Sequence, residues 1–382
     1  MKTIISNVRV ILEERINNVD IYIDEGRIIS ILPYNKNVEE KINYQVIDGK
    51  SKLLIPGMID VHIHGANNYD MMDGTTKSIQ EVSKKCAETG CTSFLATSVS
   101  STLEDLLSMI SSVKKVVGNE EGAKIVGIHL EGPYLNVEKK GMQNPKYLRH
   151  PNLDEMDLIF KEAGDLIKMV TIAPELPGGI ELIHYLRNRN VVVAIAHSTA
   201  TYEEAKKAFK EGASHITHCF NAMPAIHHRE PGLVTAALED DNVSVQAIVD
   251  GIHLHPGIIR LMHKIKGADG MVLTTDALQA MGVGDGDYLF GGHHVVVKEG
   301  VARLKDGTLA SSTITMNKSL KLSVKFGISL CDSIKMSSKT PASILSLNNT
   351  GEIKLNYDAD LVLIDDNYNV IQTFIKGKQY FK

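Results

Sequence analysis

The stretch Pro56-Gly57-Met58-Ile59-Asp60-Val61-His62-Ile63-His64-Gly65 closes an apolar, strand-like run with two histidines two positions apart. Residues i and i+2 of a β-strand point to the same face, so His62 and His64 direct two imidazoles at one point. A metal ion needs several such side chains, because one histidine cannot fill a coordination shell. An isolated His-x-His motif is also typical of the solvent-exposed face of an edge strand, so its interpretation depends on the rest of the chain.

Eight apolar β-like runs, most of them separated by helical segments, predict the fold. The runs cover 58–64, 92–99, 124–130, 167–173, 191–196, 215–220, 244–249 and 271–275, and helical patterns include 78–88, 103–117 and 202–211. Eight β/α units indicate an α/β fold of the (β/α)₈, TIM-like barrel type. Continuously apolar strands fit a parallel sheet that is covered on both faces. An open doubly wound sheet is the alternative, but no Gly-x-Gly-x-x-Gly follows the first run.

Short β-like pieces at both ends of the chain predict a second, smaller domain. They lie at 3–5, 8–11, 19–23 and 27–31 and again at 360–365 and 370–375. Neither set can bury a core of its own, so we expect both termini to build one small β-sandwich domain. The predicted division assigns 1–52 and 350–382 to this discontinuous domain and 53–349 to a metal-dependent barrel.

The amino-acid composition argues against some classes of binding partner. The chain has 382 residues, 43% hydrophobic and 23% charged, with 41 basic against 46 acidic residues and a net charge of −5. It has no basic stripe, no signal-peptide pattern and no apolar run long enough to span a bilayer, so neither a nucleic-acid nor a membrane partner is expected. Four scattered cysteines, Cys86, Cys91, Cys219 and Cys331, favour reduced thiols and a cytoplasmic location.

Metal-ligand residue types follow six of the eight runs: His62 and His64, Glu131, His197, His218, Asp250 with His253, and Asp276. Each has a plain structural explanation when taken alone, such as a helix cap for Asp276. In a barrel of this type the carboxyl ends of the strands form the face that carries the active site. The placement of all these residues at strand ends therefore favours a common metal site. Glu131, His197 and His218 form a set that suits zinc with an open position for water, although iron accepts similar ligands. Asp276 is suited to take and return a proton.

The chain resembles the N-acetylglucosamine-6-phosphate deacetylase family of the amidohydrolase superfamily. The resemblance covers nearly the whole chain. Its motifs are the 56–65 stretch, His129-Leu130-Glu131-Gly132-Pro133, Ala196-His197-Ser198, Thr217-His218-Cys219-Phe220-Asn221-Ala222-Met223, Arg229-Glu230-Pro231-Gly232, Asp250-Gly251-Ile252-His253 and Thr275-Asp276-Ala277.

The resemblance implies a metal-dependent hydrolase that converts N-acetyl-D-glucosamine 6-phosphate to D-glucosamine 6-phosphate and acetate. Glu131, His197 and His218 would hold one catalytic divalent ion, zinc or iron, and Asp276 would shuttle the proton. A second ion at His62 and His64 is left open. The phosphorylated amino sugar would contact Met142, Gln143, Asn221, Ala222, His228, Arg229, Asp250, His253, Leu309, Ala310 and Ser311. A homodimer is also implied, with Arg229 reaching into the neighbouring subunit's site.

Three positions matter when the chain is set against the family pattern. Gln143 stands where other members carry His, and Ala310-Ser311-Ser312 replaces a glycine-containing segment that lines the pocket in relatives. His62 is kept where some members have Gln, which favours a second metal.

Two other functions are weighed against this one. A cyclic amidase or dihydroorotase-like hydrolase often bridges two metals with a carbamylated lysine, but the lysine nearest to the fourth run is Lys168, before the strand. An inactive barrel that senses a sugar phosphate would have no use for Asp276 as a proton shuttle.

Overall fold

The computed structural model describes residues 2–12, 15–36 and 43–380. Eight parallel strands stand in sequence order around a barrel: β6 (Met58–Ile63), β9 (Cys91–Thr97), β10 (Lys124–Glu131), β11 (Ile167–Ile172), β12 (Val192–Ile195), β13 (His215–Ile216), β14 (Ser244–Ile248) and β15 (Met271–Thr274). The first and last strands meet through a parallel bridge between Ile63 and Ala277. Each predicted run overlaps one of these strands, so the expected (β/α)₈ barrel is confirmed.

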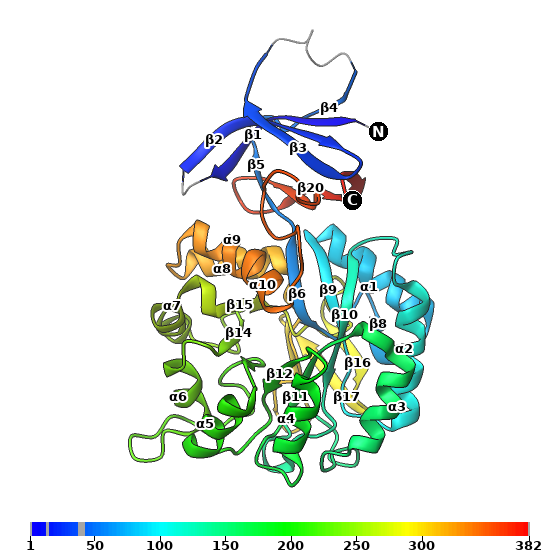
Figure 1. Cartoon of the computed structure of the whole chain (residues 1–382), viewed down its shortest axis with the longest axis vertical. Coiled ribbons are helices and arrows are strands. Elements are labelled where there is room, and N and C mark those ends of the chain that lie inside the picture. The colour runs from blue at the N-terminus through cyan, green and yellow to red at the C-terminus, as the bar shows by residue number, and fades with distance from the viewer. Residues whose placement is uncertain (1, 13–14, 37–42, 381–382) are drawn as a thin grey trace.

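Helices cover the outside of the barrel (Figure 1). They are α1 (Thr76–Glu88), α2 (Leu103–Val116), α3 (Leu153–Ala163), α4 (Gly179–Arg187), α5 (Tyr202–Glu211), α6 (Gly232–Glu239), α7 (Pro256–Gly270), α8 (Met316–Lys325), α9 (Leu330–Ser337) and α10 (Lys339–Ile344). In α1, buried Ile79, Val82 and Cys86 recur at helical spacing and face the core, and the hydroxyl of Thr75 caps the first turn.

Strands from both ends of the chain form the small β domain. They are β1 (Thr3–Leu12), β2 (Arg15–Asp24), β3 (Arg27–Pro33), β4 (Gln45–Asp48), β5 (Leu53–Pro56), β19 (Leu361–Ile364), β20 (Val370–Ile375) and β21 (Lys378–Tyr380). Their hydrogen-bonded order is β21-β20-β19-β5-β1-β2-β3, with β4 beside β1. Ile21 from the first part and Phe374 from the second share one apolar core. The pairing of the termini is confirmed, while the division at 52/53 and 349/350 stays a prediction.

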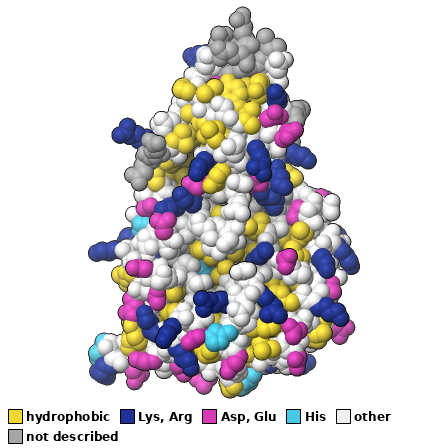
Figure 2. Space-filling model, in the orientation of Figure 1, with side chains coloured by type: hydrophobic (Ala, Val, Ile, Leu, Met, Phe, Trp, Pro, Cys, Tyr) yellow, Lys and Arg dark blue, Asp and Glu magenta, His cyan; other side chains and the backbone are white. Residues whose placement is uncertain are grey.

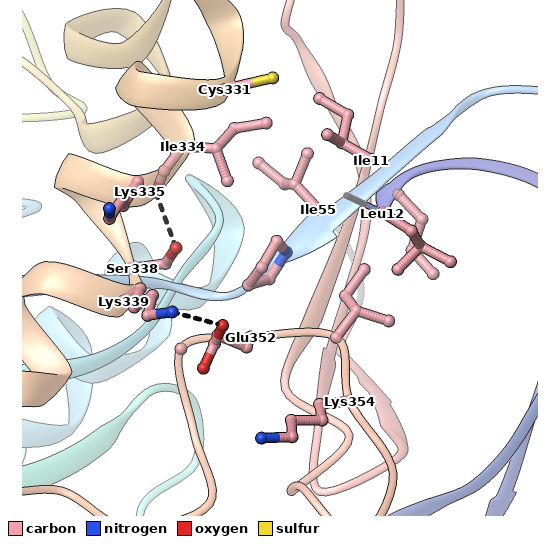
Figure 3. Close-up of a pocket in the computed structure, with 14 residues that line it drawn as sticks. Ile11, Leu12, Ile55, Cys331, Ile334, Lys335, Ser338, Lys339, Glu352 and Lys354 are labelled. Carbon is pink, nitrogen blue, oxygen red and sulfur yellow. Dashed lines mark hydrogen bonds and ion pairs between the residues drawn. The ribbon is translucent and has the colours of Figure 1, made fainter. Parts of the chain in front are cut away.

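The small domain adjoins the amino-terminal ends of the barrel strands. Lys124, the first residue of β10, forms ion pairs with Asp360 and, at 3.3 Å, with Asp358. The carboxyl ends of the strands therefore lie at the opposite end of the barrel (Figure 1). A cavity of about 530 Å³ lies between β5 and the α9–α10 region, where Lys339 and Glu352 form an ion pair of 2.9 Å (Figure 3). None of the predicted metal ligands lines this cavity.

A three-stranded antiparallel sheet, which the sequence patterns did not predict, follows the eighth barrel strand. It consists of β16 (Gly286–Phe290), β17 (His293–Lys298) and β18 (Val301–Leu304). Phe290 and Val295 pack with Met142, which follows β10, so this sheet lies at the carboxyl end of the barrel strands. A short hairpin of β7 (Gly65–Ala66) and β8 (Tyr69–Asp70) follows β6 directly.

In the view of Figure 2, hydrophobic side chains gather on the small β domain, whereas acidic and basic side chains are interspersed over the barrel. None of the described helices combines the length and the apolar character needed to cross a bilayer.

Candidate active site

The predicted ligands stand at or just beyond the ends of their strands. Glu131 is the last residue of β10, whereas His197, His218 and Asp276 each come two residues after a strand. These three have positive φ angles of 48°, 31° and 47°. Positive φ is uncommon for residues other than glycine and clusters at functional sites, where the surrounding structure enforces it. The backbone therefore departs from the strand direction at three of the predicted residues.

Glu131, His197 and His218 form one buried group. The Oε1 atom of Glu131 lies 2.9 Å from Nε2 of His218 and 3.4 Å from Nε2 of His197. One ligand atom from each residue can be chosen so that all three lie within 4.8 Å of one another.

His62, His64 and Asp276 form a second buried group beside the first. The two Nε2 atoms of His62 and His64 are 3.0 Å apart. Asp276 Oδ1 lies 3.2 Å from Nε2 of His64 and 3.5 Å from Nε2 of His62. Both histidines also approach Glu131, each with a nitrogen–oxygen distance of 3.6 Å. The six predicted residues thus make one continuous centre.

The hydrogen bonds behind the imidazoles fix which nitrogen faces the centre. His197 donates through Nδ1 to the backbone oxygen of Lys139 at 2.8 Å, so in its neutral form Nε2 carries the lone pair. Gln246 Oε1 accepts from the backbone N–H of His218 at 3.2 Å, which identifies that atom as oxygen. His62 therefore donates to it through Nδ1, at 3.1 Å, and also presents a lone pair through Nε2.

This arrangement suits a cation. In their neutral forms, His62 and His197 direct their Nε2 lone pairs toward Oε1 of Glu131, and a cation between these atoms would stabilise that arrangement. Ligand atoms around a tetrahedral ion with bonds of ~2.0–2.2 Å stand about 3.3–3.6 Å apart. The spacing of 3.4 Å between His197 and Glu131 matches that requirement, whereas the 2.9 Å between His218 and Glu131 is that of a direct hydrogen bond. The donor set is the nitrogen and oxygen mixture that zinc and ferrous iron accept.

Both carboxylates are stabilised in their charged form. Burial raises the pKa of Glu131, but the imidazoles of His62, His197 and His218 outweigh it and hold the pKa well below its usual range. Burial also raises the pKa of Asp276, but the neighbouring imidazoles of His62 and His64 outweigh it and lower the pKa to about 2. Burial lowers the pKa of His62 to about 4, so this side chain is neutral at pH 7.

A cavity of about 340 Å³ opens above this centre and brings most of the predicted substrate contacts together. Its walls include seven of them: Met142, Gln143, Asn221, Ala222, His253, Leu309 and Ser311. Asp250 stands behind His253 and accepts a 2.6 Å hydrogen bond from its Nδ1 atom. Burial raises the pKa of Asp250, but the partner His253 outweighs it and lowers the pKa. Ala310 is fully buried in the core beneath the wall.

Two further predicted contacts lie away from this cavity altogether within one chain. His228 and Arg229 are exposed and lie on the segment before α6, which projects from the barrel at the lower left of Figure 1. Arg229 Nη1 is 2.7 Å from Nε2 of His228. Neither residue is among those that line the cavity.

The two departures from the family pattern both contact predicted catalytic carboxylates. Gln143 donates through Nε2 to Oε2 of Glu131 at 2.6 Å. Ser311, at a φ of 59°, donates through its hydroxyl to Oδ1 of Asp276 at 3.1 Å. Sequence reasoning assigned both residues to the substrate, and only the folded chain places them against the two carboxylates.

Sequence reasoning missed Arg303 and Asp60. Arg303, on β18, lines the cavity, and it escaped notice because the sheet that carries it was not predicted. Asp60 is fully enclosed and accepts hydrogen bonds from the hydroxyls of Thr274 (2.9 Å) and Thr275 (2.5 Å), which ties β6 to β15. Burial raises the pKa of Asp60 to about 6. Its place in the 56–65 stretch is the signal that could have identified it.

Comparison with known proteins places the chain in a family. A model of the amidohydrolase family matches residues 53–380. An N-acetylglucosamine-6-phosphate deacetylase of Lysinibacillus sphaericus is 34% identical over 99% of this chain and 97% of its own length. An N-acetylgalactosamine-6-phosphate deacetylase of Escherichia coli O157:H7 is 33% identical over 89% of this chain and 90% of its own. The crystal structure of N-acetylglucosamine-6-phosphate deacetylase from Pasteurella multocida superposes with a TM-score of 0.94 at 30% identity, covering 100% of both chains.

The chain is a member of the amidohydrolase family. Within that family it belongs with the N-acetylglucosamine-6-phosphate deacetylases, as the motifs in its sequence indicated.

Proposed function

We propose that this chain hydrolyses the acetamide of N-acetyl-D-glucosamine 6-phosphate, giving D-glucosamine 6-phosphate and acetate. The observation that carries the proposal is the convergence of two buried metal-ligand groups, Glu131/His197/His218 and His62/His64/Asp276, beside a cavity lined by polar side chains. Similarity over nearly the whole chain to deacetylases of phosphorylated amino sugars supports it.

We assign one divalent ion, zinc or iron, to Glu131, His197 and His218, and a second, weaker position to His62 and His64. A bound ion supplies a Lewis acid that polarises a carbonyl and makes water more acidic. The hydrogen bonds of His197 to Lys139 and of His62 to Gln246 keep each Nε2 atom aimed at the centre.

Asp276 is the proposed base and acid of the reaction. Its lowered pKa keeps it ionised at neutral pH, so it can take the proton of the attacking water. The water oxygen forms a bond to the acetyl carbon, the carbon–nitrogen bond breaks, and Asp276 returns the proton to the leaving amine. Among the described residues, the contacts of Asp276 to His62, His64 and Ser311 all use Oδ1. This leaves Oδ2 to carry the proton.

The far wall of the cavity is the proposed phosphate site. Asn221 and Ala222 lie on the strained turn after β13, and Ala222 has a φ of 53°. Asp250 accepts a hydrogen bond from Nδ1 of His253, which orients the imidazole and leaves its Nε2 atom to contact a ligand. Arg303 is the one arginine or lysine on the described walls of this cavity, and its fork of N–H donors suits phosphate oxygens.

We further propose a homodimer in which Arg229 and His228 complete the neighbouring subunit's site. Their exposure on a projecting segment, away from the cavity of their own chain, supports this arrangement. We place the reaction in the cytoplasm, because the four cysteines are free thiols and three of them are buried.

The test is to incubate metal-loaded protein with N-acetylglucosamine 6-phosphate and follow acetate by proton NMR and the new amine by a ninhydrin-type assay. The galactosamine epimer is run in parallel, because a relative of similar identity carries that name. Equal amounts of acetate and amine, faster from the glucosamine substrate, are expected. Preference for the epimer would change the assigned sugar, and no acetate from either substrate would contradict the function.

A further inference from the structure

The carboxylate of Glu131 divides its two oxygens between different neighbours. Oε1 faces His218 at 2.9 Å, His197 at 3.4 Å and His62 at 3.6 Å. Oε2 instead accepts a 2.6 Å hydrogen bond from Nε2 of Gln143. A ligand to an ion in the Glu131/His197/His218 group therefore has one oxygen directed to the histidines and one held by a neutral amide.

The orientation of the Gln143 amide is fixed from its other side. Its Oε1 atom accepts a 2.9 Å hydrogen bond from the backbone N–H of Ser100, in the loop after β9. Since a backbone N–H can only donate, the atom that faces Glu131 is the NH₂ group. The backbone N–H of Gln143 donates to the oxygen of Lys140 at 2.9 Å. The side chain is 1% exposed, so water does not compete for these contacts.

We propose that Gln143 is a positioning residue whose amide occupies Oε2 of Glu131, so that Oε1 alone serves as the metal ligand toward His197 and His218. A carboxylate that rotates freely can offer either oxygen or both. The hydrogen-bond chain from Ser100 through Gln143 holds Glu131 in one orientation. Partners that orient metal ligands in this way typically contribute about 10- to 100-fold in metal affinity. The inference rests on the metal site of the proposed function and specifies how that site is held.

The arrangement also bears on the second metal position. Oε2 lies 3.6 Å from Nε2 of His64, and Oε1 lies 3.6 Å from Nε2 of His62. An ion at His62 and His64 that drew on Oε2 would share this oxygen with the amide of Gln143, and one that drew on Oε1 would share it with the first ion. The second position is therefore the weaker of the two.

The test compares Gln143→Met, which keeps the length of the side chain and removes both the NH₂ donor and the carbonyl acceptor of the amide, with Gln279→Met. Gln279 is also a buried glutamine, 8% exposed, but its amide donates to the backbone oxygen of Leu289 at 2.6 Å and not to a carboxylate. Zinc affinity is measured on metal-free protein by competition with a chromophoric chelator, in the absence of substrate.

We expect Gln143→Met to bind its tightest zinc about 10- to 100-fold more weakly than the unaltered chain, with Gln279→Met within about threefold. Equal affinity of Gln143→Met and the unaltered chain would overturn the inference. If metal-free Gln143→Met is unfolded, the zinc dependence of its melting temperature gives the same affinity.

The zinc affinity is measured in the absence of substrate and does not depend on catalytic activity. A chain that binds zinc in this pattern but releases no acetate would therefore defeat the proposed function and leave the role of Gln143 intact.

Discussion

Asp276 Oδ1 lies 3.2 Å from Nε2 of His64, so the carboxylate proposed to move the proton also belongs to the group that could hold a second ion. Asp276→Asn separates these two roles, because it keeps the shape of the side chain and removes its basicity. We expect unchanged tight zinc binding and a fall in kcat of about 10²–10⁴-fold, the range typical of general acid–base help.

The matched control is Asp287→Asn, an exposed carboxylate on β16, which should leave kcat unchanged. Loss of the tight zinc from Asp276→Asn, with kcat restored by excess zinc, would make Asp276 a ligand and assign the proton transfer elsewhere.

The second metal position is tested by the double replacement of His62 and His64 with alanine. The Nε2 atoms of these residues lie 3.0 Å apart, and both contact Asp276. Calorimetric zinc titration of the unaltered chain should show a tight and a weaker equivalent. The double variant should lose the weaker one and keep the tight one at Glu131, His197 and His218. Identical zinc stoichiometry in the two proteins would show that the pair is not a metal site.

The phosphate site is tested by comparing Arg303→Ala with Arg229→Ala. Arg303 lines the cavity of its own chain, whereas Arg229 is exposed and outside it. Hydrogen bonds to charged groups contribute about 1.5–3 kcal/mol. Either variant should therefore raise KM for the 6-phosphate about 10- to 100-fold and change KM for unphosphorylated N-acetylglucosamine little.

Lys305→Ala, which removes the exposed cation just after β18, is the control for a general charge effect. If the Arg229 effect arises across a dimer, KM should rise on dilution to concentrations at which the dimer dissociates. Equal effects of Arg303→Ala on both substrates would rule out a phosphate contact.

The pH dependence of stability gives a prediction about His215, a buried histidine that is not among the proposed metal ligands. Burial lowers the pKa of His215 to about 3, and the side chain bonds the hydroxyl of Ser244 at 2.6 Å. A histidine in the unfolded chain has a pKa near ~6.5, so below that pH the unfolded state binds the additional proton. The contribution of neutral His215 is fully present above pH ~6.5 and is lost progressively as the pH falls towards about 3.

His215→Asn keeps a donor near Ser244 and cannot titrate. We expect the slope of unfolding free energy against pH in metal-free protein, between pH 4 and 6, to fall by up to about 1.4 kcal/mol per pH unit. Urea unfolding at several pH values measures it. His150→Asn, an exposed histidine, should leave the slope unchanged. A slope in His215→Asn equal to that of the unaltered chain would mean that the folded and unfolded states bind the proton of His215 equally, which contradicts a lowered pKa in the fold.

The barrel and the small β domain could be predicted because their signals are local. Apolar runs such as 92–99 carry their strand pattern in consecutive residues, and β9 is buried along its whole length. The six residues of the metal centre were found because barrel topology brings the carboxyl ends of strands to one place. The sheet of β16, β17 and β18 escaped prediction because exposed positions such as Leu289 and Val296 are apolar like the buried Val295 beside them, so the sequence shows no alternation of polar and apolar residues.

Contacts that depend on distant parts of the chain could not be predicted in the same way. Gln143 lies in a loop, and its amide meets Glu131 only because Ser100, 43 residues earlier, anchors its other end. Ser311 reaches Asp276 across 35 residues of chain. In both cases the spacing of the residues carries no periodic pattern, so their roles became visible only in the folded chain.

The most direct test of the account is the kcat for acetate release from N-acetylglucosamine 6-phosphate as zinc is added stepwise to metal-free protein. If one ion at Glu131, His197 and His218 is essential, activity should rise linearly and break at about one equivalent per chain. Glu131→Gln should show no activity at that ratio. Full activity in metal-free protein, or none at any zinc ratio, would contradict the account.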